Sequence, residues 1–331
     1  MQKEDRWDAK KLLETSGYCW QSFTLQAGVK LDIFTAIGDS AVKGADLAKK
    51  LDADPRGLAM LLNALAAMGL VNKKGASYEN SEAGKRFLVK GSEEYVGYMI
   101  AHFQHTVTAW TRLAEFVSTG KAALAEHDMT EAQRENFLMG MHTLASAVAR
   151  NVASMIDLSA CTHLLDLGGG PGTYAIHFCL ANPFLKATIY DRPESEPYAM
   201  GMIRKFALPE RIDFAGGNYL REEIPGTYDA AWMSHILHGE GPEDCIKILK
   251  KTVSALRPGG MVYVHDFILD DTLAQPLFPA IFSLNMLVNT SKGQSYSESQ
   301  LKTMLSESGV KENRRLEITG PNDSGIICGR V

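Results

Sequence analysis

The sequence predicts an α/β fold in which a mostly helical, winged-helix N-terminal part precedes a doubly wound, largely parallel sheet with a terminal antiparallel hairpin. Up to about residue 160, apolar residues recur with helical spacing. Beyond that point, short β-rich runs alternate with helical stretches, which is typical of parallel strands joined by crossover helices. The last two β-rich runs, RRLEITG and SGIICGRV, are separated by only a short turn, so they predict the hairpin.

Length and composition limit the possible functions. A chain of 331 residues suits two packed domains, and 45% hydrophobic with 22% charged residues is normal for a globular protein. The net charge of −5 gives no general attraction to nucleic acid or to an anionic membrane, and the longest apolar stretch is too short to span a bilayer. Five scattered cysteines without a CxxC pair favour reduced thiols. We therefore expect a cytoplasmic protein that binds no membrane, nucleic acid or metal.

The first 100 residues predict a winged helix. Its expected elements are an apolar helix at 18–37, a short helix at 44–51, a helix that begins at Pro55 and ends at Gly69, two strands around Lys74 and a helical turn at 81–88. The helix from Pro55 stands where a DNA-recognition helix would be. It is apolar almost all round, and only Arg56 and Asn63 could contact bases, so dimerisation is favoured over DNA binding. A winged-helix transcription regulator is the alternative from another class.

The stretch from Tyr95 to Asp157 is again predicted to be helical, and it is rich in histidine, methionine and aromatic residues. Such side chains form an ordinary core, or they line a pocket for a flat and partly apolar ligand. We therefore expect a helical linker at 101–160 that contributes to a substrate pocket.

A glycine-rich loop carries the strongest functional signal. The run THLLDLGGGPGTYAIHF predicts a strand, a glycine-rich turn and a helix. A dinucleotide-binding GxGxxG motif fails in either frame, because Thr173 and Pro171 stand where glycine is needed. S-adenosylmethionine (SAM) carries no diphosphate. The glycines would instead let the backbone approach the methionine and ribose parts of SAM, and they are Gly168, Gly170 and Gly172.

Two acids flank this loop. Asp166 directly precedes the glycines and would hold the loop or the ammonium group of SAM. Asp191 ends the next β-rich run, KATIYD, where a carboxylate can accept hydrogen bonds from both ribose hydroxyls. A helix N-cap is the structural alternative for Asp191. Further β-rich runs follow in RIDFAGG, YDAAWMSHIL and GGMVYVHDFIL, so we expect the ligand at the carboxyl ends of these strands.

These segments resemble a known family. LLDLGGGPG, followed by YDRPES, GGNYL, SHILHGEGPEDC and LRPGGMVYVHDFIL, is similar to the SAM-dependent O-methyltransferases of the caffeate and hydroxyindole type, and the resemblance covers nearly the whole chain. It implies a class I methyltransferase fold with a dimerisation domain at 1–100, a linker and pocket region at 101–160 and a SAM-binding domain at 161–331. It also implies a homodimer that acts on a small, aromatic or polycyclic molecule.

The resemblance also implies roles for single residues. SAM would be held by Asp166, the glycine loop, Asp191, Asn218, Tyr219 and Ser234, with Asn218 and Tyr219 flanking adenine. Asn218 stands where the family has aspartate. An asparagine there keeps a hydrogen-bond acceptor but lacks the negative charge of the acid. Trp110 and Met141 would border the methyl acceptor.

His238 matches the general base of the family. A phenol is a poor nucleophile until it loses its proton, which a histidine titrating near neutral pH can accept. Asp266 stands where the family orients the base with a glutamate, while a second glutamate is missing at Ser295 and Gly239 follows the base instead of aspartate. His235, three residues before the base, is expected to be structural.

These departures leave alternatives open. O-methylation is preferred, but a carbon nucleophile or an amine needs less help from a base, so C- or N-methylation is the close alternative. A regulator that joins the winged helix to a SAM-like sensing domain is the alternative that involves no catalysis.

Overall fold

The structure, a computed structural model, describes residues 7–121, 129–318 and 320–331. These residues form two compact units that divide between His105 and Thr106. The part of the chain from Thr106 to residue 160 therefore belongs to the same unit as the large sheet. No helix within the described ranges is long and apolar enough to cross a membrane.

The first unit is a winged helix with a small antiparallel sheet. Its elements are α1 (Ala9–Gly17), α2 (Cys19–Lys30), α3 (Ile33–Ile37), β1 (Val42–Lys43), α4 (Gly44–Lys50), α5 (Pro55–Ala67), β2 (Val71–Lys74), β3 (Ser77–Asn80) and α6 (Glu82–Leu88), and α7 (Gly97–Trp110) contains the boundary to the second unit. The strands pair in the order β1-β3-β2.

The expectation of a single helix at 18–37 is wrong. α2 ends at Lys30 and α3 begins at Ile33, since Asp32 between them has a left-handed φ of 55°. A right-handed helix cannot continue through that conformation.

The ends of α5 follow the sequence signals. Pro55 lies in its first turn, and the Asp54 carboxylate accepts a hydrogen bond from the Gly57 N–H at 2.7 Å. At the other end Gly69 has a φ of 75°, and its N–H donates to the Ala66 carbonyl at 3.0 Å. The helix packs into the core of the first unit through Leu58, Leu62 and Leu65.

The second unit is built around an eight-stranded sheet. Its helices are α8 (Leu113–Thr119), α9 (Glu131–Met155), α10 (Thr173–Ala181), α11 (Glu196–Lys205), α12 (Pro242–Ser254), α13 (Leu277–Asn289) and α14 (Glu298–Glu307). Its strands are β4 (His163–Leu167), β5 (Lys186–Asp191), β6 (Ile212–Gly216), β7 (Tyr228–Ser234), β8 (Leu256–Leu269), β9 (Tyr296–Ser297), β10 (Lys311–Arg315) and β11 (Ser324–Arg330). The order is β10-β11-β8-β7-β4-β5-β6, with β9 beside β8.

The predicted hairpin exists, with a shifted first strand. β11 runs antiparallel to both β8 and β10, while the strands from β8 to β6 pair in parallel. β10 ends at Arg315, so it begins and ends earlier than the run RRLEITG, of which Thr319 lies outside the described residues. Beyond Arg315 the Leu316 N–H donates to the Ile326 carbonyl at 2.8 Å, and the Gly320 N–H donates to the Ser324 carbonyl at 2.9 Å near the turn.

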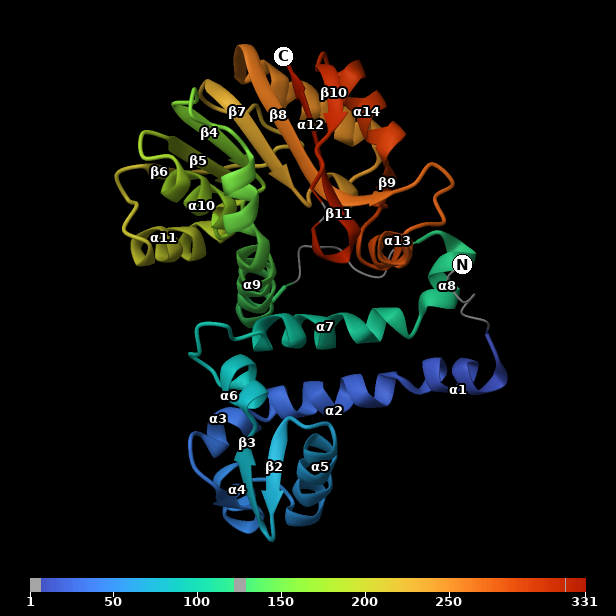
Figure 1. The fold of residues 1–331 in the computed structure, drawn as a ribbon. Coiled ribbons are helices and arrows are strands. Elements are labelled where there is room, and N and C mark those ends of the chain that lie inside the picture. Colours follow the sequence, from blue (N-terminus) through green and yellow to red (C-terminus); the bar gives the residue numbers. More distant parts are fainter. Residues whose placement is uncertain (1–6, 122–128, 319) are drawn as a thin grey trace. The chain divides into compact units, whose positions relative to one another are not determined.

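Helices cover both faces of the sheet. α9, α10 and α11 pack on one face around the fully buried Trp232, and α12 and α14 pack on the other face (Figure 1). The chain leaves β4 toward β5 on one side and later leaves β7 toward β8 on the other, so the strand order reverses between β4 and β7. Ligands bind at such a reversal, outside the carboxyl ends of the strands.

Candidate active site

The glycine loop connects β4 to α10 at that reversal. Gly168, Gly170 and Gly172 all have left-handed φ values, of 66°, 51° and 76°. A Cβ atom on Gly172 would collide with the Ile189 side chain, and one on Gly168 would lie 2.5 Å from the Ile236 side chain. Side chains are therefore excluded at Gly168 and Gly172. Gly168 and Gly169 are only half-buried, so a ligand can approach the backbone at that end of the loop.

Asp166 is a buried acid below the loop. Its Oδ2 accepts a hydrogen bond from the Ala175 N–H at 3.1 Å, whereas its Oδ1 has no hydrogen-bond partner among the described residues. Burial raises the pKa of Asp166 to about 7, and the bond from Ala175 opposes this rise. A buried carboxylate oxygen without a partner is costly, and a cationic donor is the group that would satisfy it.

Asp191 joins the end of β5 to the glycine loop. Its Oδ2 accepts from the Gly170 N–H at 2.6 Å, and its Oδ1 accepts from the Arg192 N–H at 2.6 Å and the Ser195 hydroxyl at 3.2 Å. Burial raises the pKa of Asp191, although these three bonds act in the opposite direction. The carboxylate thus organises the turn after β5, and it keeps acceptor capacity for a ligand hydroxyl because each oxygen has two lone pairs.

Asn218 and Tyr219 lie in the loop after β6. The Asn218 side-chain oxygen accepts a hydrogen bond from the Leu220 N–H at 2.9 Å, which closes a local turn. The Lys251 ammonium donates to the Tyr219 carbonyl at 3.3 Å. Both residues are half-buried at the same edge of the sheet as Asp191, since Asp191 and Gly216 are register partners of β5 and β6.

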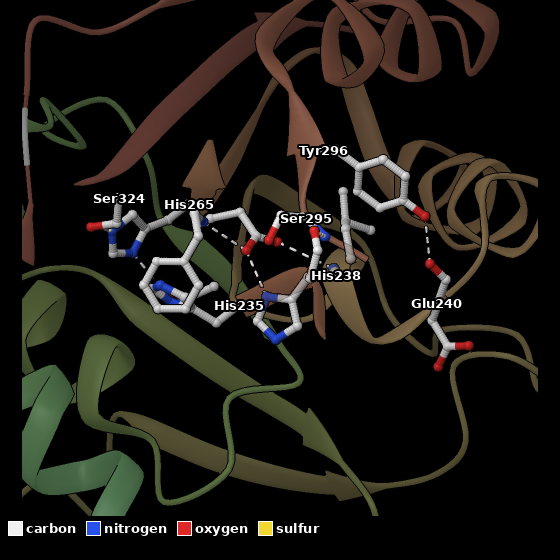
Figure 2. Close-up of polar contacts among 12 residues, drawn as sticks. His235, His238, Glu240, His265, Ser295, Tyr296 and Ser324 are labelled. Atoms are coloured by element: carbon white, nitrogen blue, oxygen red, sulfur yellow. Dashed lines mark hydrogen bonds and ion pairs between the residues drawn. The ribbon is translucent and has the colours of Figure 1, made fainter. Parts of the chain in front are cut away.

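Ser234 ends β7 and faces two histidines. Its Oγ lies 2.8 Å from Nδ1 of His235 and 3.0 Å from Nδ1 of His265. The other ring nitrogen of His265 lies 3.1 Å from the Ser324 hydroxyl. His265 and Ser324 lie side by side in Figure 2. Ser234 therefore belongs to a polar chain that extends from β7 across β8 to β11.

His238 is bonded to Asp266. Nδ1 of His238 lies 2.6 Å from Oδ1 of Asp266, and the side chains are 12% and 3% exposed. Burial acts to raise the pKa of Asp266, but His238, His235 and the Phe267 N–H outweigh it and lower the pKa. Asp266 is therefore a carboxylate that accepts the Nδ1 proton, which leaves the lone pair of His238 on Nε2.

Two phenylalanines contact this histidine, and a third packs against them. The ring centroid of Phe282 lies 4.8 Å from that of His238, and Phe267 lies 6.0 Å from His238 in a nearly parallel orientation. Phe278 contacts Phe267 at 4.9 Å. Phe278 and Phe282 are one turn apart on α13, so this helix presents an aromatic wall to the base candidate.

Trp110 and Met141, the two residues expected to border the methyl acceptor, have different surroundings. The Trp110 indole N–H donates to Asn285 Oδ1 at 3.0 Å, and Asn285 is on α13 one turn beyond Phe282. Trp110 is thereby linked to the helix that carries the aromatic wall. Met141 is half-buried on α9, which packs against α10, and no described contact links Met141 to His238.

The chain matches known proteins over most of its length. The O-methyltransferase dimerisation domain matches residues 13–90, and the O-methyltransferase domain matches residues 107–311. The chain belongs to the SAM-dependent O-methyltransferase family. This membership favours an oxygen acceptor over the C- and N-methylation left open by the sequence, and it excludes a purely regulatory role for the SAM-like domain.

Two bacterial relatives and one solved structure illustrate the match. The 3-hydroxy-5-methyl-1-naphthoate 3-O-methyltransferase of Streptomyces sahachiroi is 30% identical over 94% of this chain and 92% of its own. The tetracenomycin polyketide synthesis 8-O-methyl transferase TcmO of Streptomyces glaucescens is 30% identical over 95% of each chain. Human N-acetylserotonin methyltransferase, solved in complex with SAM, has a TM-score of 0.87 at 24% identity and covers 99% of both chains. That structure has the same fold.

The residues of this methyltransferase fit SAM. The acid Asp166 directly below the loop suits the cofactor's ammonium group by charge, and the half-buried backbone at Gly168 and Gly169 gives room for the methionine part. Asp191 lies at the end of the adjacent strand, where ribose hydroxyls are bound in folds of this kind.

Sequence motifs did not reveal how the enzyme holds its His238 turn, the 3-10 turn Leu237–Gly239. The Tyr296 hydroxyl donates to the Glu240 carbonyl at 2.5 Å (Figure 2). The Cys245 thiol donates to the Leu237 carbonyl at 3.2 Å. A Cβ atom on Gly293 would collide with the His238 carbonyl, so the backbone at Gly293 packs directly against the turn.

Proposed function

We propose that this O-methyltransferase transfers a methyl group to a hydroxyl of a small aromatic or polycyclic molecule, with His238 as the general base. The observation that carries the proposal is the bond between His238 Nδ1 and Asp266, which leaves Nε2 of a half-buried imidazole as a proton acceptor. The relatives named above act on a naphthoate and in polyketide synthesis, and the aromatic wall on α13 suits ring systems of that kind.

In this proposal the crevice at the carboxyl ends of β4, β5 and β7 would hold SAM. Asp166 would attract its ammonium group by charge, Asp191 would bind its ribose, and Asn218 and Tyr219 would flank its adenine. Ser234 and the glycine loop would lie beside its methionine part. When bound, SAM supplies a methyl group on a positively charged sulfur. The chain's own residues must align the acceptor oxygen with that methyl group and exclude water.

His238 performs the proton transfer in this mechanism. Its Nε2 accepts the proton of the acceptor hydroxyl as the oxygen becomes the nucleophile. The ring becomes an imidazolium, which the Asp266 carboxylate stabilises through the Nδ1 hydrogen bond. Phe267 and Phe282 keep bulk water away from the reacting oxygen, and the imidazolium returns its proton to solvent after the product leaves.

The remaining regions have proposed roles that follow the sequence. Residues 1–100 form the dimerisation domain, 101–160 join it to the pocket with Trp110 and Met141 beside the acceptor, and 161–331 bind SAM.

A homodimer is supported by large apolar side chains exposed on α1 and α2, including Leu13 at 74% and Trp20 at 78%, within the region that matches the dimerisation domain. All five cysteines are free, which suits the reducing cytoplasm.

Calorimetry and product analysis test the proposal together. Titration with SAM and with S-adenosylhomocysteine (SAH) should show binding of both, and absence of binding by either would contradict the cofactor assignment. Methyl-labelled SAM is then incubated with a panel of hydroxynaphthoates, dihydroxynaphthalenes and aromatic amines. We expect methyl ethers as products, and a C- or N-methylated product from aromatic amines alone would contradict the acceptor class.

A further inference from the structure

His235 has an unusual backbone conformation close to the base candidate. It follows directly after β7 and has a left-handed φ of 57°, a conformation that costs a non-glycine residue free energy. Its N–H donates to the His265 carbonyl at 2.8 Å, which holds the residue beside β8. A conformation of this kind persists where the surrounding structure enforces it, and such residues concentrate at functional sites.

A buried polar chain orients the His235 ring. Nδ1 of His235 contacts Ser234, which contacts His265, and His265 in turn contacts the Ser324 hydroxyl and lies 3.2 Å from the Tyr174 hydroxyl. His265 and Ser324 are both 2% exposed. Polar groups buried in this way stabilise one arrangement only when their bonds are satisfied, so the chain holds the imidazole in a single orientation.

The His235 ring keeps one nitrogen for a ligand. Burial lowers its pKa well below the ordinary value, and the nearby His265 and His238 lower it further against the opposing effect of Asp266. The ring is therefore neutral near pH 7. Nδ1 is engaged by Ser234, while Nε2 has no hydrogen-bond partner within the described part of the chain, and the residue is half-buried rather than sealed.

His235 and His238 lie close to each other and share Phe267 as a neighbour. Their ring centroids are 6.0 Å apart, and both rings contact Phe267, His235 at 4.5 Å and His238 at 6.0 Å. Each ring has its Nδ1 tied back to the protein. Hydrogen bonds from nitrogen to oxygen span about 2.9 Å, so two neighbouring oxygens of one acceptor can each reach one of the rings.

We propose that His235 is a specificity-determining residue, whose Nε2 hydrogen-bonds a second oxygen of the acceptor next to the hydroxyl that His238 deprotonates. The inference rests on the proposed function and narrows its substrate class to aromatic rings with two oxygens on adjacent carbons. A hydroxyl suits either tautomer of the neutral ring, because it can both donate and accept.

Two isomers and two variants test this inference. The probes are 2,3-dihydroxynaphthalene, with adjacent hydroxyls, and 2,7-dihydroxynaphthalene, with remote ones, each titrated calorimetrically into the SAH-bound enzyme. His235→Asn tolerates the left-handed backbone and keeps a polar atom near the Nδ1 position, but it does not reach the ligand. His235→Gln has its amide near the Nε2 position instead. Melting temperature and SAH affinity report whether each variant is folded.

We expect the wild-type enzyme to bind the 2,3-isomer about three- to tenfold more tightly than the 2,7-isomer, as one added hydrogen bond implies. His235→Gln should keep most of this preference, and His235→Asn should lose it while binding the 2,7-isomer as well as wild type does. A preference retained in His235→Asn would overturn the proposal and leave His235 a purely structural role.

Equal affinity of the wild type for the two isomers, or binding of neither, would also overturn it. Failure of the proposed function has a different signature. In that case the isomers bind with the expected preference, but SAM transfers no methyl group to either of them.

Discussion

Nδ1 of His238 and Oδ1 of Asp266 are 2.6 Å apart, and the same carboxylate accepts hydrogen bonds from the backbone N–H groups of His238 and Phe267. The acid thus binds both the ring and the backbone of the residue it orients. This arrangement fixes which imidazole nitrogen can accept a proton, and it makes the histidine and the aspartate separately testable.

Replacement of the histidine should affect turnover and spare cofactor binding. In His238→Ala the acceptor hydroxyl loses its base, so kcat should fall by about 10²- to 10⁴-fold. The SAM dissociation constant should stay near the wild-type value, because the described hydrogen bonds and ring contacts of His238 are with Asp266, His235, Phe267 and Phe282 and not with the glycine loop or Asp191. Steady-state kinetics and calorimetry measure the two quantities, and unchanged turnover would remove His238 from this role.

Asp266→Asn should alter the pH profile as well as the rate. The amide has nearly the shape of the acid but offers the imidazolium no counter-charge, so kcat should fall by a smaller factor than in His238→Ala. The acid limb of the kcat/KM profile should move to lower pH, since the protonated ring is less stabilised. A variant with reduced kcat and an unmoved profile would indicate that Asp266 only supports the fold.

Removal of Asp191 should weaken cofactor binding. Asp191→Ala deletes the proposed ribose acceptor together with the bond to the Gly170 N–H. Loss of a hydrogen bond to a charged group costs roughly 1.5–3 kcal/mol, so calorimetry should give a correspondingly weaker SAM affinity. Asp191→Asn is the matched control, because it retains an oxygen for Gly170. An alanine variant with wild-type affinity speaks against the ribose assignment.

The buried acid below the loop predicts a pH dependence of stability. Burial raises the pKa of Asp166 from 3.8 to about 7 in the folded chain. Between these values the unfolded chain has released a proton that the folded chain keeps, so the free energy of unfolding falls as the pH rises through this window.

Asp166→Asn removes that contribution. Without SAM, its melting temperature should exceed that of the wild type at about pH 8, and the advantage should shrink toward about pH 4. Thermal scans across this range provide the measurement. An advantage that does not change with pH would mean that Asp166 does not titrate as its burial implies.

Local patterns were sufficient for most of the fold. The glycine run, the strand end at Asp191 and the helix that starts at Pro55 depend on residues close together in sequence, and the structure has them as expected. The run YDAAWMSHIL also forms a strand, which ends at Ser234, three residues earlier than the run. The helix break at Asp32 was missed because one residue with a left-handed backbone carries little sequence signal. The start of β10 was missed for a related reason, since its boundary depends on pairing with β11.

The surroundings of the base could not be predicted. Phe278 and Phe282 on α13, and Tyr296 beyond it, reach the His238 turn only through tertiary packing of distant segments. The predictions for His238 and Asp266 came from a family pattern, and their bond confirms that the two residues meet. His235 was expected to be merely structural, because nothing in the sequence indicates its left-handed backbone or its bond to Ser234.

The bond between the Gly170 N–H and Asp191 has a thermodynamic consequence for ligand binding. The same carboxylate also holds the Arg192 N–H and the Ser195 hydroxyl, so two loops from neighbouring strands are locked to each other by the chain itself. Because these loops are already ordered, they lose little conformational entropy when the nucleoside binds. A larger part of the free energy of the contacts then contributes to the binding affinity.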